Sequence, residues 1–214
     1  MVAGIIFDLD GTLLDTLEDL YEAVNHTLRR YGCPGRTREE VRKAVGNGAR
    51  NLILRSLPGK ETDPPVEQVL ADYQAYYDGL CVDGKTCPYP GVLEQLEQVA
   101  KKYPVAIVSN KPHISVKPLC EKFFPGIYAL GASDDTPRKP APDMVRKAMA
   151  AMDMESCIYV GDSEVDVLTA RNTGVPCLSV LWGFRDREEL IAAGAAHLCE
   201  NVQNMGVMLE QLIK

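Results

Sequence analysis

Two carboxylates lie one residue apart near the start of the chain, where they could act as a nucleophile and as an acid or base. The segment MVAGIIFDLDGT places Asp8 and Asp10 after a short apolar run and before a glycine. Like charges this close repel each other, and a half-buried pair costs stability unless a cation or a proton compensates it. Asp and Gly are also common in turns, so an acidic turn that closes a strand is the simpler interpretation. Partners elsewhere in the sequence must decide between the two.

Further polar residues follow strand-like apolar runs or precede a predicted helix. Ser109 and Asn110 follow VAIV, Asp162 and Asp166 follow CIYVG, and Lys139 lies in the loop RKPAP. In an open parallel sheet, ligands bind at the carboxyl ends of the strands, so these side chains are expected to meet the first pair there. Each has a structural interpretation as a helix cap, a solvated lysine or a first-turn acid. Four such coincidences at corresponding strand ends are less probable than one site.

The arrangement of apolar runs predicts a doubly wound α/β fold with a parallel sheet. The runs cover residues 2–7, 105–109, 127–131, 157–161 and 177–182, and helical patterns alternate with them after residue 101. Residues 16–84 interrupt this alternation with four amphipathic helical patterns. Capping signals at Thr16-x-x-Asp19 and Thr37-x-x-Glu40 open the first two. We therefore expect a core formed by residues 1–15 and 85–214, with a helical cap domain inserted at 16–84.

Together these residues resemble the motifs of the haloacid dehalogenase superfamily of hydrolases, over the whole chain. DLDGT is similar to its first motif, Ser109 to the second, Lys139 to the third and GDSEVD to the fourth. The resemblance implies a Rossmann-like core with a first-type cap between motifs one and two. It also implies that Asp8 is a nucleophile that forms an aspartyl-phosphate and that Asp10 is the general acid and base.

The same resemblance implies a Mg²⁺ site formed by Asp8, the Asp10 carbonyl and Asp162, with Asp166 behind them. A carboxylate that attacks a phosphate dianion meets anionic repulsion, which an oxygen-ligated cation and a lysine offset. The phosphate-binding residues expected from their chemistry are Thr12, Ser109, Asn110 and Lys139. The covalent intermediate divides one difficult displacement into two steps.

The acid at position 10 indicates phosphoryl transfer, because hydrolytic dehalogenases of this superfamily lack an acid two residues after the nucleophile. Phosphonate-cleaving relatives instead use a cap lysine to form a Schiff base. Lys43 and Lys60 are the lysines between Thr16 and Lys85, and either could serve such a reaction.

A glycine-rich segment of the cap is the main indication of the substrate. It reads Gly46-Asn47-Gly48-Ala49-Arg50, which is either a flexible loop or a set of backbone N–H groups and an arginine that contact an anion. The segment is similar to the cap of phosphoglycolate phosphatases, as are PYPGVLEQLEQVA, SNKP and WGF. This favours 2-phosphoglycolate, with its carboxylate facing Arg50 or the loop amides. An acidic pair, Asp134 and Asp135, precedes Lys139 and has no predicted role.

Composition excludes several other classes of function. The net charge of −7, with scattered Lys and Arg, argues against nucleic-acid and membrane partners. No apolar run approaches 18 residues, and the opening apolar run lacks a basic flank. Seven cysteines without a C-x-x-C pair fit reduced thiols in a cytoplasmic protein. A monomer and a weak homodimer are both compatible with the sequence.

Two alternatives to a phosphatase stay open at this level. A phosphomutase would use the same aspartyl-phosphate and return the phosphoryl group to a sugar, and the motifs do not distinguish it. A non-catalytic Mg²⁺- or phosphate-binding module would keep the acidic pocket, but it would not need the helical insertion. Fold resemblance alone does not decide among these functions.

Overall fold

A parallel sheet of six strands forms the centre of the molecule within residues 3–59 and 65–213, which this computed structural model describes. The strand order is β5-β4-β1-β6-β7-β8, and every neighbouring pair is parallel. The strands are β1 (Ala3–Phe7), β4 (Val105–Pro112), β5 (Tyr128–Ala132), β6 (Ser156–Gly161), β7 (Cys177–Val180) and β8 (His197–Cys199). The predicted doubly wound α/β fold is confirmed. The short edge strand β8 was not predicted.

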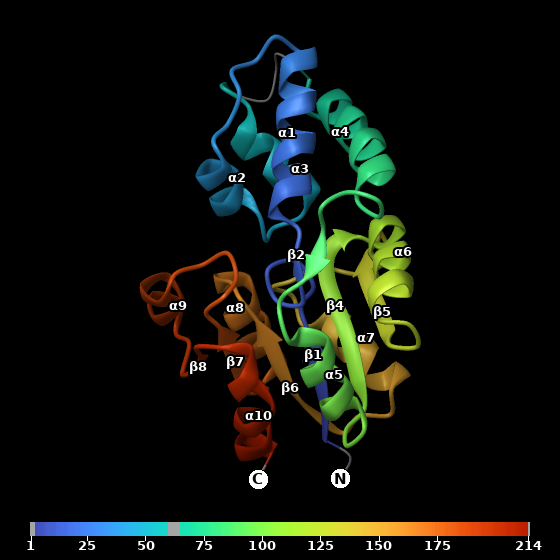
Figure 1. Ribbon diagram of the computed structural model, residues 1–214, viewed down its shortest axis with the longest axis vertical. Coiled ribbons are helices and arrows are strands. Elements are labelled where there is room, and N and C mark those ends of the chain that lie inside the picture. The colour runs from blue at the N-terminus through green and yellow to red at the C-terminus, as the bar shows by residue number, and fades with distance from the viewer. Residues whose placement is uncertain (1–2, 60–64, 214) are drawn as a thin grey trace.

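Helices cover both faces of the sheet because its central strands are apolar on both sides (Figure 1). Ile5 and Phe7 of β1 pack into the core cluster that includes α5, α6 and α10, whereas Ile6 packs into the cluster that includes α7 and α8. Burying one such side chain contributes about 1.5–3 kcal/mol. The helices are α5 (Val92–Ala100), α6 (His113–Phe123), α7 (Asp143–Ala151), α8 (Glu164–Thr173), α9 (Arg187–Ala193), the short 3₁₀ turn η1 (Val202–Asn204) and α10 (Met205–Ile213).

Four further helices lie beyond the carboxyl ends of the strands, at the end of the molecule opposite both termini (Figure 1). These cap helices are α1 (Leu17–Arg30), α2 (Arg38–Ala44), α3 (Ala49–Ser56) and α4 (Val66–Leu80). A two-stranded antiparallel ribbon, β2 (Leu14–Asp15) with β3 (Cys87–Pro88), connects them to the core. Its strands of two residues each carry no readable alternation, and they were not predicted. The exact domain limits stay a prediction.

The capping signals that were predicted for the first two cap helices have different outcomes. Thr37 and Glu40 form the predicted reciprocal capping box of α2. At α1, Thr16 makes no side-chain cap, and Asp19 turns to the returning chain instead. Its buried carboxylate accepts hydrogen bonds from the Lys85 amide at 2.8 Å and from the Thr86 amide and hydroxyl at 2.7 and 2.6 Å. Asp19 therefore ties the start of the cap helices to the segment that leaves them.

We predict that Asp19→Ala lowers the free energy of unfolding by about 3 kcal/mol, because it removes a buried charged acceptor and leaves its donors unpaired. Denaturant titration of purified protein measures this value. Glu94→Ala is the matched control, since Glu94 is also a first-turn acid but is exposed on α5. Equal effects of the two substitutions would contradict the assignment.

Candidate active site

A pocket opens between the carboxyl edge of the sheet and the cap helices, and its empty volume of about 670 Å³ includes space open to solvent. The core contributes Asp8, Asp10, Ser109, Asn110, Lys111 and Asp162 to its lining. The cap contributes Gly46, Gly48, Ala49, Leu52, Tyr73 and Tyr77. Residues separated by more than 150 positions in the sequence thus share one site.

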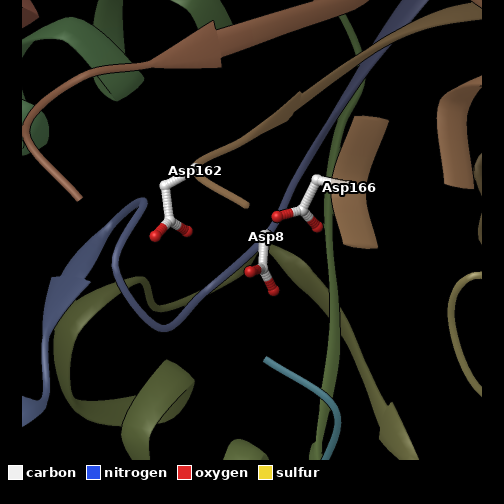
Figure 2. A group of neighbouring side chains, drawn as sticks. All are labelled: Asp8, Asp162 and Asp166. Atoms are coloured by element: carbon white, nitrogen blue, oxygen red, sulfur yellow. The ribbon is translucent and has the colours of Figure 1, made fainter. Parts of the chain in front are cut away.

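Three carboxylates converge beside this pocket (Figure 2). Asp8 follows β1, whereas Asp162 and Asp166 lie at the end of β6 and in the first turn of α8. One oxygen of each lies within 4.8 Å of the others, and all three residues are buried. Buried carboxylate oxygens in this arrangement are the ligands that a hard divalent cation prefers. The carboxylate of Asp10 lies outside this group.

Hydrogen bonds and two close glycines fix the position of Asp162. The Thr12 hydroxyl donates to its Oδ1 at 2.9 Å, and the Phe184 amide donates to its Oδ2 at 2.7 Å. A Cβ at Gly11 or Gly183 would lie 2.3 Å from an atom of Asp162, so only glycine allows this approach. The expected contact of Thr12 with phosphate stays a prediction, and the hydrogen bond that the structure shows for the Thr12 hydroxyl is the one to Asp162. This buried hydroxyl orients Asp162 at the base of the site.

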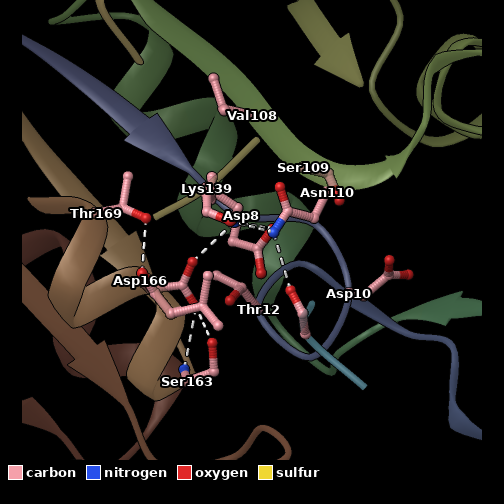
Figure 3. A network of polar contacts seen from close by, with 12 residues as sticks. Asp8, Asp10, Thr12, Val108, Ser109, Asn110, Lys139, Ser163, Asp166 and Thr169 are labelled. Atoms are coloured by element: carbon pink, nitrogen blue, oxygen red, sulfur yellow. Dashed lines mark hydrogen bonds and ion pairs between the residues drawn. The ribbon is translucent and has the colours of Figure 1, made fainter. Parts of the chain in front are cut away.

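Lys139 lies buried between two of the carboxylates (Figure 3). Its Nζ is 2.8 Å from Asp8 Oδ1, 2.8 Å from Asp166 Oδ1 and 2.9 Å from the Tyr159 hydroxyl. The amide and the hydroxyl of Ser163 in turn donate to Asp166 Oδ2. Asp166 therefore holds Lys139 in place beside Asp8, and its own oxygens already have donors.

The pKa values of the cluster follow from burial and from mutual repulsion. Burial and the charge of Asp166 raise the pKa of Asp162 to about 7, although the Phe184 amide, Thr12 and Arg185 oppose the shift. Burial also raises the pKa of Asp8 well above its ordinary value, against the effect of Lys139. Burial disfavours the Lys139 ammonium, but the charges of Asp166 and Asp8 raise its pKa overall. A bound cation would remove the excess of negative charge.

Asp10 lies apart from the Lys139 network (Figure 3), and it pairs with a different lysine, Lys111. Lys111 Nζ lies 2.8 and 2.9 Å from the two Asp10 oxygens and 4.7 Å from the centre of the Tyr77 ring. Burial opposes the charge of Lys111, but Asp10 raises its pKa overall. The sequence analysis gave Lys111 no role. Lys111 could have been found from its position two residues after Ser109, at a strand end that carries polar residues.

Ser109 and Asn110 both line the pocket, as expected, at the end of β4. The Ser109 hydroxyl oxygen accepts a hydrogen bond from the Lys111 amide at 3.2 Å. Asn110 Nδ2 donates to the Gly46 carbonyl at 3.1 Å and to the Lys139 carbonyl at 2.9 Å. Asn110 therefore links the core to the cap loop and to the loop of Lys139.

Comparison with known proteins identifies the family of this chain. Residues 5–180 match the haloacid dehalogenase-like hydrolases. The chain belongs to this family. A phosphoglycolate phosphatase of Agrobacterium fabrum is 36% identical over 194 residues, which cover 85% of this chain and 81% of that protein. Phosphoglycolate phosphatase 1 of Pseudomonas aeruginosa is 33% identical over 213 residues, covering 94% and 77%.

A solved structure supports the same assignment. The crystal structure of a proposed phosphoglycolate phosphatase from Lactobacillus delbrueckii subsp. bulgaricus superimposes with a TM-score of 0.89 at 32% identity. The match covers 96% of this chain and 97% of that chain. The resemblance inferred from the motifs is thereby confirmed, and the similarity supports a phosphatase.

The cap loop of this hydrolase only partly faces the pocket. Gly46, Gly48 and Ala49 are among the lining residues, but Asn47 and Arg50 are not. The two glycines have φ values of 116° and 82°, which L-residues rarely adopt. Arg50 Nε donates to Glu67 at 2.8 Å, and 45% of its side chain is exposed.

Other charged residues singled out in the sequence lie away from the pocket lining. Lys43 is 59% exposed and pairs with Glu39 at 3.4 Å, whereas Lys60 lies outside the described residues. Asp135 pairs with Lys147 at 3.3 Å, and its hydrogen bonds with Ser133 and Lys147 lower its pKa to about 2. These contacts give Asp135 a local role in its own loop.

A buried arginine that the sequence analysis missed connects core and cap. Arg185 follows WGF and donates to the carbonyls of Val45 at 2.8 Å and Arg42 at 3.2 Å, at the carboxyl end of α2. Glu164 holds the guanidinium at 2.7 Å. In the opposite direction, Arg42 donates to the Phe184 carbonyl. A cation at helix-terminal carbonyls is favourable.

We predict that Arg185→Met loosens the end of α2, since each hydrogen bond to a charged group contributes about 1.5–3 kcal/mol. Hydrogen–deuterium exchange over residues 38–48 should become faster by about tenfold or more. Arg187→Met is the control, because Arg187 is a nearby exposed arginine that pairs with Glu200. Unchanged exchange in Arg185→Met would show that other contacts hold the cap.

The raised pKa of Asp162 predicts how stability depends on pH without metal. Between its unfolded pKa of about 3.9 and its folded pKa of about 7, the folded protein binds more protons than the unfolded chain. Stability therefore falls as pH rises through this range.

We expect Asp162→Asn to flatten this dependence and to be more stable than the wild type at pH 8 in chelator. Its amide oxygen can accept from Phe184, and its NH₂ can donate to a rotated Thr12 hydroxyl. Thermal unfolding between pH 5 and pH 8 tests this, with the exposed Asp143→Asn as control. Parallel curves for wild type and Asp162→Asn would contradict it.

Proposed function

We propose that this hydrolase is a Mg²⁺-dependent phosphatase that cleaves a small phosphate monoester, 2-phosphoglycolate, through an aspartyl-phosphate. The observation that carries the proposal is the buried contact of Lys139 with Asp8, at the base of the pocket and beside two further carboxylates. The arrangement brings together a nucleophile, Asp8, a fixed positive charge, Lys139, and a set of carboxylates that could bind a cation. Phosphate transfer needs all three.

The chain's own residues supply the steps. The Asp8 carboxylate attacks phosphorus, the bond to the ester oxygen breaks, and Asp10 gives its proton to the departing alcohol. Asp10 then takes a proton from water, whose oxygen attacks phosphorus and releases Asp8 and inorganic phosphate. Lys139 and the Ser109 hydroxyl hold the non-reacting phosphate oxygens.

The cation site would belong to Asp8 and Asp162, with the backbone carbonyl of Asp10. When bound there, Mg²⁺ neutralises negative charge on the phosphate and on its carboxylate ligands. The raised pKa values of Asp8 and Asp162 support this assignment, because burial and the charges of neighbouring carboxylates raise them and a cation would offset both effects. Asp166 lies behind them and positions Lys139.

The choice of 2-phosphoglycolate rests on the relatives named above and on the position of the cap at the pocket. The cap helices α1, α3 and α4 contribute to the lining of the pocket over the reacting groups, so a small ester fits more readily than a large one. We further propose that Gly46, Gly48 and Ala49 contact the substrate from the cap and that the remaining loop residues, Asn47 and Arg50, support them. Exclusion of water by the cap favours transfer within the pocket.

We also propose that the enzyme acts in the cytoplasm as a monomer or weak homodimer, without nucleic-acid or membrane partners. All seven cysteines are free thiols, which supports a reducing compartment. The net charge of −7 supports the absence of a polyanionic partner. In the part of the chain that the structure describes, no helix has the length and apolar character needed to cross a bilayer.

Phosphate release from a panel of esters tests the proposed function. We expect 2-phosphoglycolate to be preferred in kcat/KM over pyrophosphate, glucose phosphates and nucleoside monophosphates, and chelator to abolish turnover. Asp8→Asn should lower kcat by at least about 1,000-fold, because it removes the nucleophile. The exposed Asp143→Asn is the control variant.

The other outcomes select among the alternatives. Preference for another ester would leave the mechanism and change the substrate. Interconversion of hexose phosphates without phosphate release would identify a phosphomutase. Inert esters together with retained Mg²⁺ binding would favour a non-catalytic binding module.

A further inference from the structure

The pocket contains a second positive charge that the phosphate chemistry does not use. Lys111 is buried, lines the pocket and lies on β4 two residues after Ser109. The register of β4 against β5 shifts between Ser109 and Pro112, and such bulges redirect side chains next to active sites. Two residues advance a strand by about 7 Å at most. This is the length scale of a two-carbon phosphate ester.

The donors of Lys111 are only partly used. An ammonium has three N–H groups, and two of them meet the two oxygens of Asp10. The Tyr77 ring lies 4.7 Å from the same nitrogen, a cation–π contact that holds the ammonium at the cap side of the pocket. One donor is therefore left for a ligand within the described residues.

A second unused donor lies beside the first. Tyr77 lines the pocket, its residue is 3% exposed, and its hydroxyl has no hydrogen-bond partner among the described residues. A buried hydroxyl without a partner costs stability, so a ligand that accepts from it gains the missing hydrogen bond. Tyr77 comes from α4, and Lys111 comes from the core. The contact between the two therefore joins the cap to the core.

The surroundings favour a small anion at this place. Leu52 and the Tyr73 ring belong to the same pocket wall, and an apolar wall strengthens a charge-assisted hydrogen bond. Asp78 also lines the pocket and opposes an anion there, and the hydrogen bond that its Oδ1 accepts from the Ser115 hydroxyl at 2.6 Å offsets part of this effect. Arg50, in contrast, is engaged with Glu67 outside the pocket lining.

We propose that Lys111 and Tyr77 form the subsite that binds the carboxylate of the substrate, so that specificity for a phosphorylated hydroxy acid depends on the strand end and α4. This inference rests on the proposed phosphatase function and specifies its substrate class. The ammonium supplies an ion pair with the carboxylate, and the phenol donates a second hydrogen bond to the same ionised acceptor.

The test compares 2-phosphoglycolate with its amide, which has the same shape without the charge. The carboxylate preference is the ratio of the two kcat/KM values. We expect a carboxylate preference of about 10- to 100-fold in the wild type, since a hydrogen bond to a charged group contributes about 1.5–3 kcal/mol. Lys111→Met should reduce the preference to about one, and Tyr77→Phe should reduce it by about tenfold. Thermal unfolding confirms that each variant is folded.

Two control variants match the substitutions. Lys117→Met removes an exposed lysine on α6, and Tyr76→Phe removes a hydroxyl on α4 that bonds to Glu22. Both should keep the wild-type preference. If Lys111→Met and Tyr77→Phe slow both esters by the same factor, the two residues only position Asp10 and the cap, and the subsite is overturned.

Binding separates failure of the subsite from failure of the phosphatase function. The dissociation constants of the acid and of the amide are measured by calorimetry in the Asp8→Asn background, with and without Lys111→Met. If no ester is hydrolysed but the acid still binds more tightly in a Lys111-dependent way, the catalytic proposal fails and the subsite stands. Equal affinities for acid and amide overturn the subsite whatever the activity.

Discussion

The contact of one buried ammonium with two buried carboxylates is the constraint on which the rest of the structure depends. Lys139 lies between Asp8 and Asp166, and neither sign of charge is tolerable there alone. The surrounding hydrogen bonds hold the three charged side chains in place. Ser163 orients Asp166, and the Lys139 ammonium donates to the Tyr159 hydroxyl on β6. The remaining excess of negative charge, centred on Asp8 and Asp162, makes the site suitable for a cation.

The parallel sheet brings these carboxylates together because the carboxyl ends of its neighbouring strands lie side by side. Asp8 and Asp162 follow neighbouring strands, β1 and β6, whose paired residues place the two ends side by side. The close approach also requires missing side chains. Gly11 and Gly183 leave room at Asp162, and a Cβ at Gly161 would lie 2.3 Å from the Asp166 Cβ. The acidic site and the glycines around it are therefore one structural feature.

The sequence predicted the elements whose patterns are local and missed those that depend on distant partners. The apolar runs identified five of the sheet strands, and spacing together with capping signals indicated the four cap helices that the structure describes, whereas β8 is too short to show a period. The positions of Asp8, Ser109 and Lys139 at strand or loop ends made their convergence predictable. Lys111 and Arg185 were missed because their partners, Asp10 and the end of α2, are about 100 and 140 residues away.

The loop after β7 connects the carboxylate cluster to the cap. The Phe184 amide holds Asp162, and the next residue, Arg185, holds the carboxyl end of α2. Any movement of this loop therefore shifts both Asp162 and the carboxyl end of α2. Asn110 makes a similar link from β4, since one amide group contacts both the Gly46 carbonyl and the Lys139 carbonyl. Because these links are short and buried, the cap cannot open without disturbing the residues that hold the reacting groups, and this ties ligand binding to closure.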